Sequence, residues 1–293
     1  MKASDPQAAI QTLLTSTSAS SPEQGARSIV KTCGMTSETD ISQSLQAGAG
    51  LIGLIFAQKS PRAVRSVEQA KKLVEVVRRY GERTTQLDLL GSAPADVRVG
   101  ESQAASWYQA MGEVLRKTTL RKPLTVGVFQ NQPLEEVNEW IRDAGLDLAQ
   151  LHGQEDLAYM KQVQVPCIKV LHMAPTDVGG GAADSRALGL EQLKAAALEY
   201  AGTAVALLLD SKMPGAEGGG TGKVFDWTMA RDLHDLTGGM QVLLAGGLTP
   251  DNVGQARGTE GVLGVDVSSG IEVSPGVKDV PMMQLFIRNT LAD

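Results

Sequence analysis

Val205-Ala206-Leu207-Leu208-Leu209-Asp210 is an unbroken apolar run that ends on a carboxylate. Continuous apolar runs of this length are typical of parallel strands that are buried on both faces of a sheet. From residue 28 onward, the sequence contains eight such runs. The predicted strands are Ser28–Cys33, Leu51–Ala57, Thr125–Phe129, Leu148–His152, Cys167–Leu171, Val205–Asp210, Gln241–Ala245 and Gly264–Val267.

Segments with helical periodicity separate these strands. The amphipathic stretches are Val67–Arg79, Leu134–Ala144, Leu188–Tyr200 and Pro281–Leu291. Eight strand–helix units within about 250 residues favour a closed (β/α)8 barrel, because an open doubly wound sheet usually has fewer strands. We therefore predict a single α/β domain with a TIM-barrel fold over residues 28–293.

Two segments interrupt this rhythm. Gly81–Lys122 lies between the second helix and the third strand and is far longer than an ordinary connection. We predict a surface insertion there, with an extra helix at Trp107–Leu115. Since catalytic loops follow the strands of a barrel and this segment precedes one, we expect it to be dispensable for activity. Ala174–Asp184, which contains three consecutive glycines, is predicted to be a flexible loop.

Composition restricts the location and partners of the protein. Residues 1–27 are rich in Ser, Thr and Ala, lack a basic start followed by an apolar block, and carry Asp5 and Glu23. We predict a disordered extension on a cytoplasmic protein. The formal net charge of −6 argues against a nucleic-acid partner, and no apolar run is long enough to cross a membrane. Two cysteines are too few for a disulfide framework.

Polar groups and glycines follow the predicted strands, where a barrel enzyme carries its catalytic residues. Because the carboxyl ends of all eight strands meet at one face, we expect these residues to share a pocket. They are Cys33, Arg62, Gln150, His152, Asp210, Gly246, Gly247, Asp266, Ser268, Ser269 and Gly270.

Seven motifs that contain these residues resemble, in the same order, those of the phosphoribosylanthranilate isomerases of tryptophan biosynthesis. They are VKTCGMT (30–36), GLIFAQKSPR (53–62), VGVFQN (126–131), QLHG (150–153), LDSKMPGAEGGGTGKVFDW (209–227), AGGL (245–248) and VDVSSG (265–270). The resemblance extends from Ser28 to the C-terminus. The N-terminal extension and Gly81–Lys122 depart from compact family members, and Thr32 stands where the family usually has Ile or Leu.

The resemblance implies an Amadori rearrangement that converts N-(5-phosphoribosyl)anthranilate to 1-(2-carboxyphenylamino)-1-deoxyribulose 5-phosphate. General acid–base catalysis suffices for this reaction, so no cofactor is expected. By resemblance, Asp210 is the acid and Cys33 is the base. We expect apolar surroundings to raise the pKa of Asp210 and the positive potential of a phosphate site to lower the pKa of Cys33.

Without the motifs, both residues would have simpler interpretations. A cysteine within an apolar strand is usually a small core residue, and this interpretation is kept for Cys167. An aspartate that ends a strand is commonly a turn former or a helix cap.

The remaining site residues receive their expected roles from the resemblance and from their chemistry. Gly246, Gly247, Ser268, Ser269 and Gly270 are expected to hold the phosphate, and Arg62 the anthranilate carboxylate. Asp266 is expected to contact a sugar hydroxyl or to orient a neighbouring residue, with a structural role as the alternative. Gln150 and His152 are possible pocket-lining residues. A glycine-rich segment is expected to act as a lid, with a mobile surface loop as the alternative; its residues are Gly218, Gly219, Gly220, Thr221 and Gly222.

No metal site is predicted, because His172 and His234 do not join His152 at metal-ligand spacing. We expect a small phosphorylated substrate as the only partner, and either a monomer or a homodimer.

Two other functions compete with the isomerase. One is an indole-glycerol-phosphate synthase, which uses lysine and glutamate at strand ends; Lys31 is present, but no acidic partner for it is evident. The other is a barrel that only binds a sugar phosphate, and the presence of both Cys33 and Asp210 argues against it.

Overall fold

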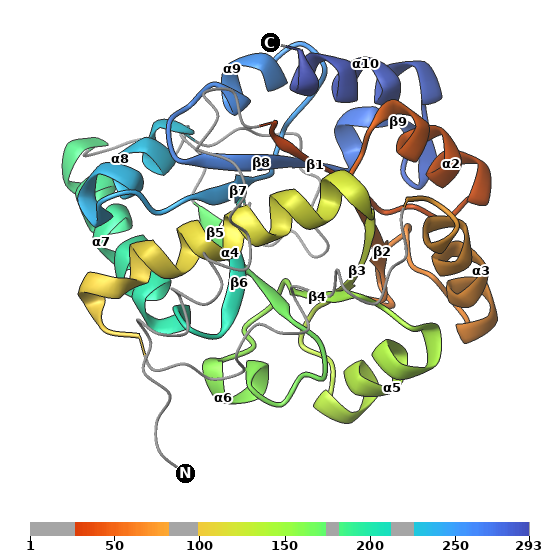
Figure 1. Cartoon of the computed structure of the whole chain (residues 1–293), viewed down its shortest axis with the longest axis horizontal. Coiled ribbons are helices and arrows are strands. Elements are labelled where there is room, and N and C mark those ends of the chain that lie inside the picture. Colours follow the sequence, from red (N-terminus) through yellow and green to blue (C-terminus); the bar gives the residue numbers. More distant parts are fainter. Residues whose placement is uncertain (1–26, 82–98, 174–181, 212–225, 293) are drawn as a thin grey trace.

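The computed structural model describes residues 27–81, 99–173, 182–211 and 226–292. Eight parallel strands form a closed barrel in sequence order, which confirms the predicted TIM barrel (Figure 1). Each strand lies within two residues of its predicted bounds. The strands are β1 Ile29–Cys33, β2 Leu51–Ile55, β3 Leu124–Phe129, β4 Leu148–Leu151, β5 Cys167–Met173, β6 Ala204–Ser211, β7 Val242–Leu244 and β8 Val262–Val267.

Helices surround the barrel, and the four stretches predicted to be helical correspond to α3, α5, α7 and α10 (Figure 1). The amphipathic pattern expected of them is weak in α7. The helices are α2 Glu38–Ala47, α3 Val67–Arg78, α4 Glu101–Arg121, α5 Leu134–Ala144, α6 Leu157–Met160, α7 Ala182–Tyr200, α8 Thr228–Thr237, α9 Val253–Arg257 and α10 Val280–Leu291. A short 3-10 turn, η2 (Ser269–Ile271), and a hairpin of β9 (Glu272–Ser274) and β10 (Val277–Lys278) follow β8. None of the helices in the described ranges has an apolar stretch long enough to cross a bilayer.

Local sequence signals account for where several helices begin. Ser37 and Ser66 cap α2 and α3 by accepting hydrogen bonds from the backbone N–H groups three residues later. Asp279 caps α10 in the same way, and Pro281 stands in the first turn, where a proline costs no hydrogen bond. Helix α7 begins at Ala182, so residues 182–184 are helical, although the sequence predicted a loop there. Residues 174–181 lie outside the described part of the chain, as do residues 1–26.

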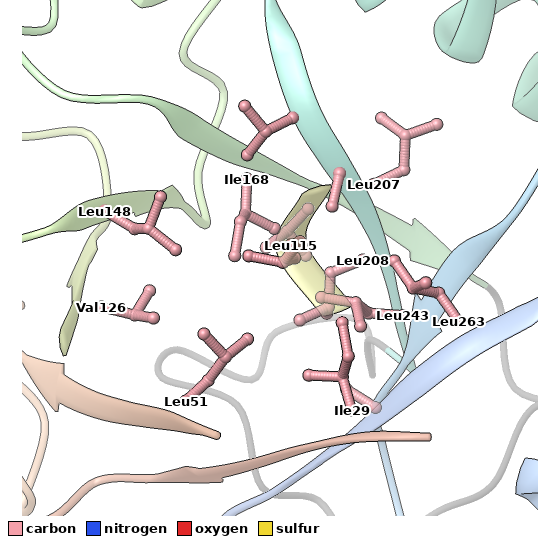
Figure 2. Close-up of a cluster of buried hydrophobic side chains, with 14 of the residues drawn as sticks. Ile29, Leu51, Leu115, Val126, Leu148, Ile168, Leu207, Leu208, Leu243 and Leu263 are labelled. Carbon is pink, nitrogen blue, oxygen red and sulfur yellow. The ribbon is translucent and has the colours of Figure 1, made fainter. Parts of the chain in front are cut away.

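The register of the strands fixes which residues point into the barrel. Side chains of a strand alternate between its two faces, and register partners on neighbouring parallel strands share a face. On each strand, every second residue therefore points into the barrel, and we call these residues the inward row of that strand. Each inward row runs from the amino-terminal (lower) end of the barrel to the carboxyl-terminal (upper) end, and its first residues are apolar. Figure 2 shows the interior of the barrel near the amino-terminal ends of the strands. The inward side chains there point toward one another and are at most 3% exposed; they include Ile29, Leu51, Val126, Leu148 and Ile168.

Helix α4 closes the amino-terminal end of the barrel. The indole Nε1 of Trp107 donates to the carbonyl of Ala204 at the start of β6, at 2.8 Å, and Leu115 enters the interior, fully buried (Figure 2). The predicted Trp107–Leu115 helix is thus confirmed but extends over Glu101–Arg121. This part of the segment is a core element and not a surface insertion, while residues 82–98 lie outside the description. Deleting the whole segment would therefore remove part of the core.

Truncating the end of α4 that enters the barrel should lower stability. Leu115→Ala leaves a cavity among the inward leucines, and we expect a loss of about 2–5 kcal/mol in the free energy of unfolding. Leu120→Ala is the matched control, because Leu120 lies on the same helix and is 55% exposed; its effect should stay within about 0.5 kcal/mol. Denaturant unfolding of both variants measures the difference, and equal losses would contradict the placement of α4.

Candidate functional site

One pocket opens at the carboxyl ends of the strands, and it gathers the site residues that the sequence predicted. Its lining includes Cys33, Arg62, Gln150, His152, Asp210, Gly246, Gly247, Asp266, Ser268, Ser269 and Gly270. The inward residues are apolar at the lower end of the barrel, but the last ones on several strands are polar and line this pocket. The predicted lid, residues 218–222, lies outside the described residues and stays a prediction.

Cys33 ends the inward row of β1, above Ile29 and Lys31. Its register partner on β2 is Gly53, and a Cβ at that position would lie only 2.6 Å from the sulfur of Cys33. A glycine is therefore needed there to make room for the thiol. Burial raises the pKa of Cys33, and the opposing effect of Lys31 does not offset it. This is opposite to the direction expected from the sequence, because burial outweighs the positive charge that the site provides.

Lys31 is fully buried directly beneath this cysteine and joins the first strand to the last. Its ammonium donates to Oδ1 of Asp266 at 3.0 Å, and the two residues are register partners between β1 and β8. It also forms a hydrogen bond with the side chain of Cys33. Burial alone would lower the pKa of Lys31, but Asp266 and Cys33 raise it above its usual value. Lys31 therefore carries a positive charge beside the thiol.

The acidic partner that the sequence analysis did not find for Lys31 is thus Asp266. It was overlooked because it lies 235 residues away along the chain. Only the closure of the barrel places the two residues side by side.

Asp210 ends the inward row of β6, above Ala206 and Leu208. Burial, and next the negative charge of Asp266, raise its pKa to about 7, which agrees with the expected direction. Nε2 of His152 lies 3.4 Å from its Oδ2. Near neutral pH, this carboxyl group holds its proton in a substantial fraction of molecules, unlike an ordinary aspartate.

The segments after β7 and β8 contain glycines at positions where the backbone conformation or the close packing would not admit a larger residue. Gly246 and Gly247 have φ of +77° and +66°, a region that other residues rarely adopt. A Cβ at Gly270 would lie 1.8 Å from the carbonyl oxygen of Leu248, so the two segments pack against each other closely. The hydroxyl of Ser268 is buried with no hydrogen-bond partner among the described residues. A ligand in the pocket could therefore accept a hydrogen bond from this group.

Arg62 lies in the pocket wall, where it is held by a partner that the sequence analysis missed. Its Nε and Nη2 donate to the carboxylate of Glu272 at 2.8 Å and 2.7 Å. Lys278 donates to the same carboxylate at 2.7 Å and to the backbone carbonyls of Cys33 and Ser268 at 2.7 Å and 3.1 Å. The β9–β10 hairpin thereby fastens Arg62 to the strand ends. Glu272 and Lys278, which flank a short turn just after the last barrel strand, were the signal in the sequence that could have revealed this partner of Arg62.

Two histidines come together beside Asp210. His152 extends the inward row of β4, and His172 lies on the inward row of β5 as the register partner of Asp210. Their ring centroids are 5.1 Å apart, and Nε2 of His172 lies 3.0 Å from the carbonyl oxygen of His152. The expectation that they do not combine at metal-ligand spacing is wrong, because neighbouring strands bring together residues that are distant in sequence. The predicted fifth strand ended at Leu171, one residue too early to include His172.

A model of one protein family matches residues 82–289, and the family is described as N-(5'phosphoribosyl)anthranilate (PRA) isomerase. The N-(5'-phosphoribosyl)anthranilate isomerase of Wickerhamomyces anomalus is 33% identical over 264 residues, which are 90% of this chain and 99% of that protein. The enzyme of the same name from Xanthomonas campestris pv. campestris is 35% identical over 262 residues, 89% of this chain and 92% of that protein.

Some relatives are much longer than the matched region. The tryptophan biosynthesis protein TRP1 of Phytophthora nicotianae is 38% identical over 264 residues, which are 89% of this chain but 46% of that protein. A multifunctional tryptophan biosynthesis protein of Phycomyces blakesleeanus is matched over 32% of its length, at 33% identity over 88% of this chain. The chain therefore spans half or less of these two relatives.

Solved structures have the same fold. The phosphoribosyl anthranilate isomerase of Thermus thermophilus has a TM-score of 0.57 at 26% identity, over 89% of this chain and 97% of its own. The enzyme from Thermotoga maritima has a TM-score of 0.59 at 25% identity, over 90% and 98%. With a family model that matches most of its length and a relative that it covers almost from end to end, this chain belongs to the phosphoribosylanthranilate isomerase family.

Proposed function

We propose that this chain isomerises N-(5-phosphoribosyl)anthranilate to 1-(2-carboxyphenylamino)-1-deoxyribulose 5-phosphate. The observation that carries the proposal is the pairing of two groups in one pocket. Asp210 is a carboxyl group whose pKa rises to about 7, and Cys33 is a thiol beside the buried charge of Lys31. The family membership of the chain supports the same reaction.

In the first step, Asp210 donates a proton to the ring oxygen of the ribose. The C1′–O bond then breaks, and the anthranilate nitrogen supplies the electron pair that forms a protonated imine. A carboxyl group with a pKa near the working pH suits this task, since it both holds a proton and gives it up readily.

In the second step, the thiolate of Cys33 removes the proton from C2′. The electron pair of the C–H bond moves toward the imine, and the resulting enolamine rearranges to the ketone. One proton enters the substrate and one leaves, so the conversion is redox-neutral overall. Lys31 stabilises the thiolate that the step requires, because an ammonium beside a thiol favours its charged form.

The rest of the pocket would bind the two anionic ends of the substrate. Gly246, Gly247, Ser268, Ser269 and Gly270 bind the phosphate through backbone N–H groups and hydroxyls. Arg62 binds the anthranilate carboxylate with the N–H groups that Glu272 leaves available. Gln150 and His152 line the space between these ends.

Turnover tests this function directly. Phosphoribosylanthranilate formed in the assay should lose its anthranilate fluorescence when the protein is added, and neither a synthase for the next step nor a simple binding protein would produce that loss.

We further propose that the protein works in the cytoplasm, where its thiols stay reduced, as a monomer or a homodimer.

The pH profile of kcat/KM should show a break near pH 7. Activity requires protonated Asp210 and deprotonated Cys33 together. Below about pH 7, Asp210 is already protonated, so activity rises about tenfold per pH unit as the thiolate forms. Above that break, the two fractions change in opposite directions and give a plateau, which ends where Cys33 titrates.

A break near pH 4, where an ordinary aspartate titrates, would contradict the environment described for Asp210. Plotting kcat beside kcat/KM separates this break from the ionisation of the free substrate's own phosphate.

Asp210→Asn distinguishes a proton donor from a structural residue. Asparagine keeps the shape but cannot deliver a proton, so we expect kcat to fall at least about 10²-fold, nearly as far as in Asp210→Ala, with little change in KM. The folded-state pKa of Asp210 is raised, so its stabilising contribution is complete below about pH 4 and is lost as the pH rises through about 7. Above pH 7, Asp210→Asn should therefore melt no lower than the wild type. An active Asp210→Asn enzyme would rule out the assignment, and the exposed Asp251→Asn is the matched control.

Lys31→Met should raise the pKa of Cys33 and lower kcat by at least about tenfold. The ultraviolet absorbance of the thiolate against pH measures that pKa, because burial raises the pKa of Cys167 to about 12 and keeps it protonated. The single variant leaves Asp266 buried and unpaired, which destabilises the fold. The double variant Lys31→Met/Asp266→Asn removes both charges and should recover stability but not activity. If activity also returned, Lys31 would serve only to neutralise Asp266.

A further inference from the structure

We infer that His152, His172 and Asp210 form a binding site for a divalent cation of the zinc class, and that occupation of this site inhibits the enzyme. One ring nitrogen of each histidine and a carboxylate oxygen of Asp210 all lie within 4.8 Å of one another. Two imidazoles and a carboxylate are a ligand set that zinc-class ions prefer, with one coordination position left for a solvent molecule.

Two of the ligands lie on the neighbouring strands β5 and β6, and the third directly follows β4. His172 and Asp210 are register partners on β5 and β6, and His152 follows β4 on the inward row that continues from Gln150. Nε2 of His152 and Oδ2 of Asp210 are 3.4 Å apart. In a tetrahedral site with ligand bonds of about 2.1 Å, neighbouring ligand atoms lie roughly 3.4 Å apart. One edge of the tetrahedron is therefore already in place, and the third ligand atom lies within 4.8 Å of both ends of that edge.

Both histidines also have the outer contacts that fix a metal-binding imidazole. A ligating histidine usually donates its other N–H to a carbonyl or a carboxylate, which orients the ring and sets the tautomer. The ring of His172 is held in this way at the backbone carbonyl of His152, at 3.0 Å.

His152 has such a neighbour in Gln150. The side-chain amide of Gln150 lies 3.2 Å from Nδ1 of His152, and its Oε1 is buried with no partner among the described residues. Turning this amide by 180° lets Oε1 accept from Nδ1–H, which satisfies that oxygen. The tautomer that results leaves the lone pair of Nε2 directed to the side of Asp210.

Occupation of the site would remove the acid from catalysis. A cation bound to the carboxylate of Asp210 holds it in its charged form, so it has no proton to give to the ring oxygen. This consequence for activity rests on the proposed function, whereas binding of the ion does not. His172 does not line the substrate pocket, so it can be changed without removing a group that contacts the substrate.

The test is calorimetric titration of the full chain with Zn²⁺ in a buffer free of chelators. We expect one equivalent to bind, and His172→Gln to weaken binding at least about tenfold. His234→Gln is the matched control, because His234 belongs to a second cluster, with the exposed Asp235 and Glu260, that lies apart from the pocket. His172→Asn serves as a second variant if His172→Gln fails to fold, with circular dichroism as the check.

Cys33 is the competing ligand for the ion, and the cysteine variant separates the two possibilities. Cys33→Ser should bind Zn²⁺ as tightly as the wild type, and the Co²⁺ complex of the wild type should lack a thiolate charge-transfer band. Loss of binding in Cys33→Ser or in His234→Gln, or no binding even at millimolar Zn²⁺, would overturn the site.

Inhibition is measured separately from binding. Without added metal, His172→Gln should turn over like the wild type, and the Zn²⁺ concentration that halves the rate should rise at least about tenfold. Binding that leaves turnover unaffected would overturn the inhibitory role alone. A protein that binds Zn²⁺ as described but never converts the substrate would overturn the proposed function and leave the metal site standing.

Discussion

A closed barrel forces every second residue of eight strands into one shared interior. That interior excludes water at its lower end, so an unpaired charge there would cost several kcal/mol. The inward residues at that end are accordingly apolar, as Ile29 on β1, Leu51 on β2 and Leu208 on β6 illustrate. They become polar only where the pocket gives access to solvent, a substrate or a charged partner. The chemistry of the molecule is therefore confined to one end by the same constraint that builds its core.

Lys31 and Asp266 lie at the boundary between these two regions. Because they pair across the contact between β1 and β8, each gains a partner only when the barrel is closed. The ion pair supplies a fixed positive charge beside Cys33 without an uncompensated charge in the core. Arg62, Glu272 and Lys278 repeat this arrangement in the pocket wall, where each buried charge has a partner in the protein. Such groups are oriented before a substrate arrives, which lowers the cost of reorganisation during a reaction.

Asp210 has a different environment from these paired groups. Burial and the negative charge of Asp266 both favour its protonated form, while Lys31, already committed to Asp266, opposes them only in part. Lys31 favours the charged form of the thiol and of Asp266, but burial is the largest influence on both Cys33 and Asp210 and raises the pKa of each. The acid and the base of this pocket are therefore both tuned mainly by desolvation.

The sequence alone could predict what depends on local pattern. Strand positions followed from continuous apolar runs, and the shared location of Cys33, Asp210 and the glycines followed from the rule that strand ends meet at one face. The partnership of Lys31 with Asp266 and of Arg62 with Glu272 depends on closure across more than 200 residues, which no periodicity reveals. His172 was missed because its strand runs on past Leu171 to Met173, and a boundary error of two residues concealed an inward side chain.

Helix α4, at the other end of the barrel, was also only partly predictable from the sequence. The sequence suggested an insertion because a long segment, residues 79–123, separates α3 from β3, and length alone cannot distinguish a surface loop from a helix that closes the barrel. Trp107 and Leu115 provided a clue, since large apolar side chains on a helix need a surface against which to pack. Beneath the level of Lys31, that surface is the open lower end of the barrel. The ion pair separates this helix from the pocket, so sequence changes in α4 should affect how firmly the barrel holds together, while changes at the strand ends decide what it does.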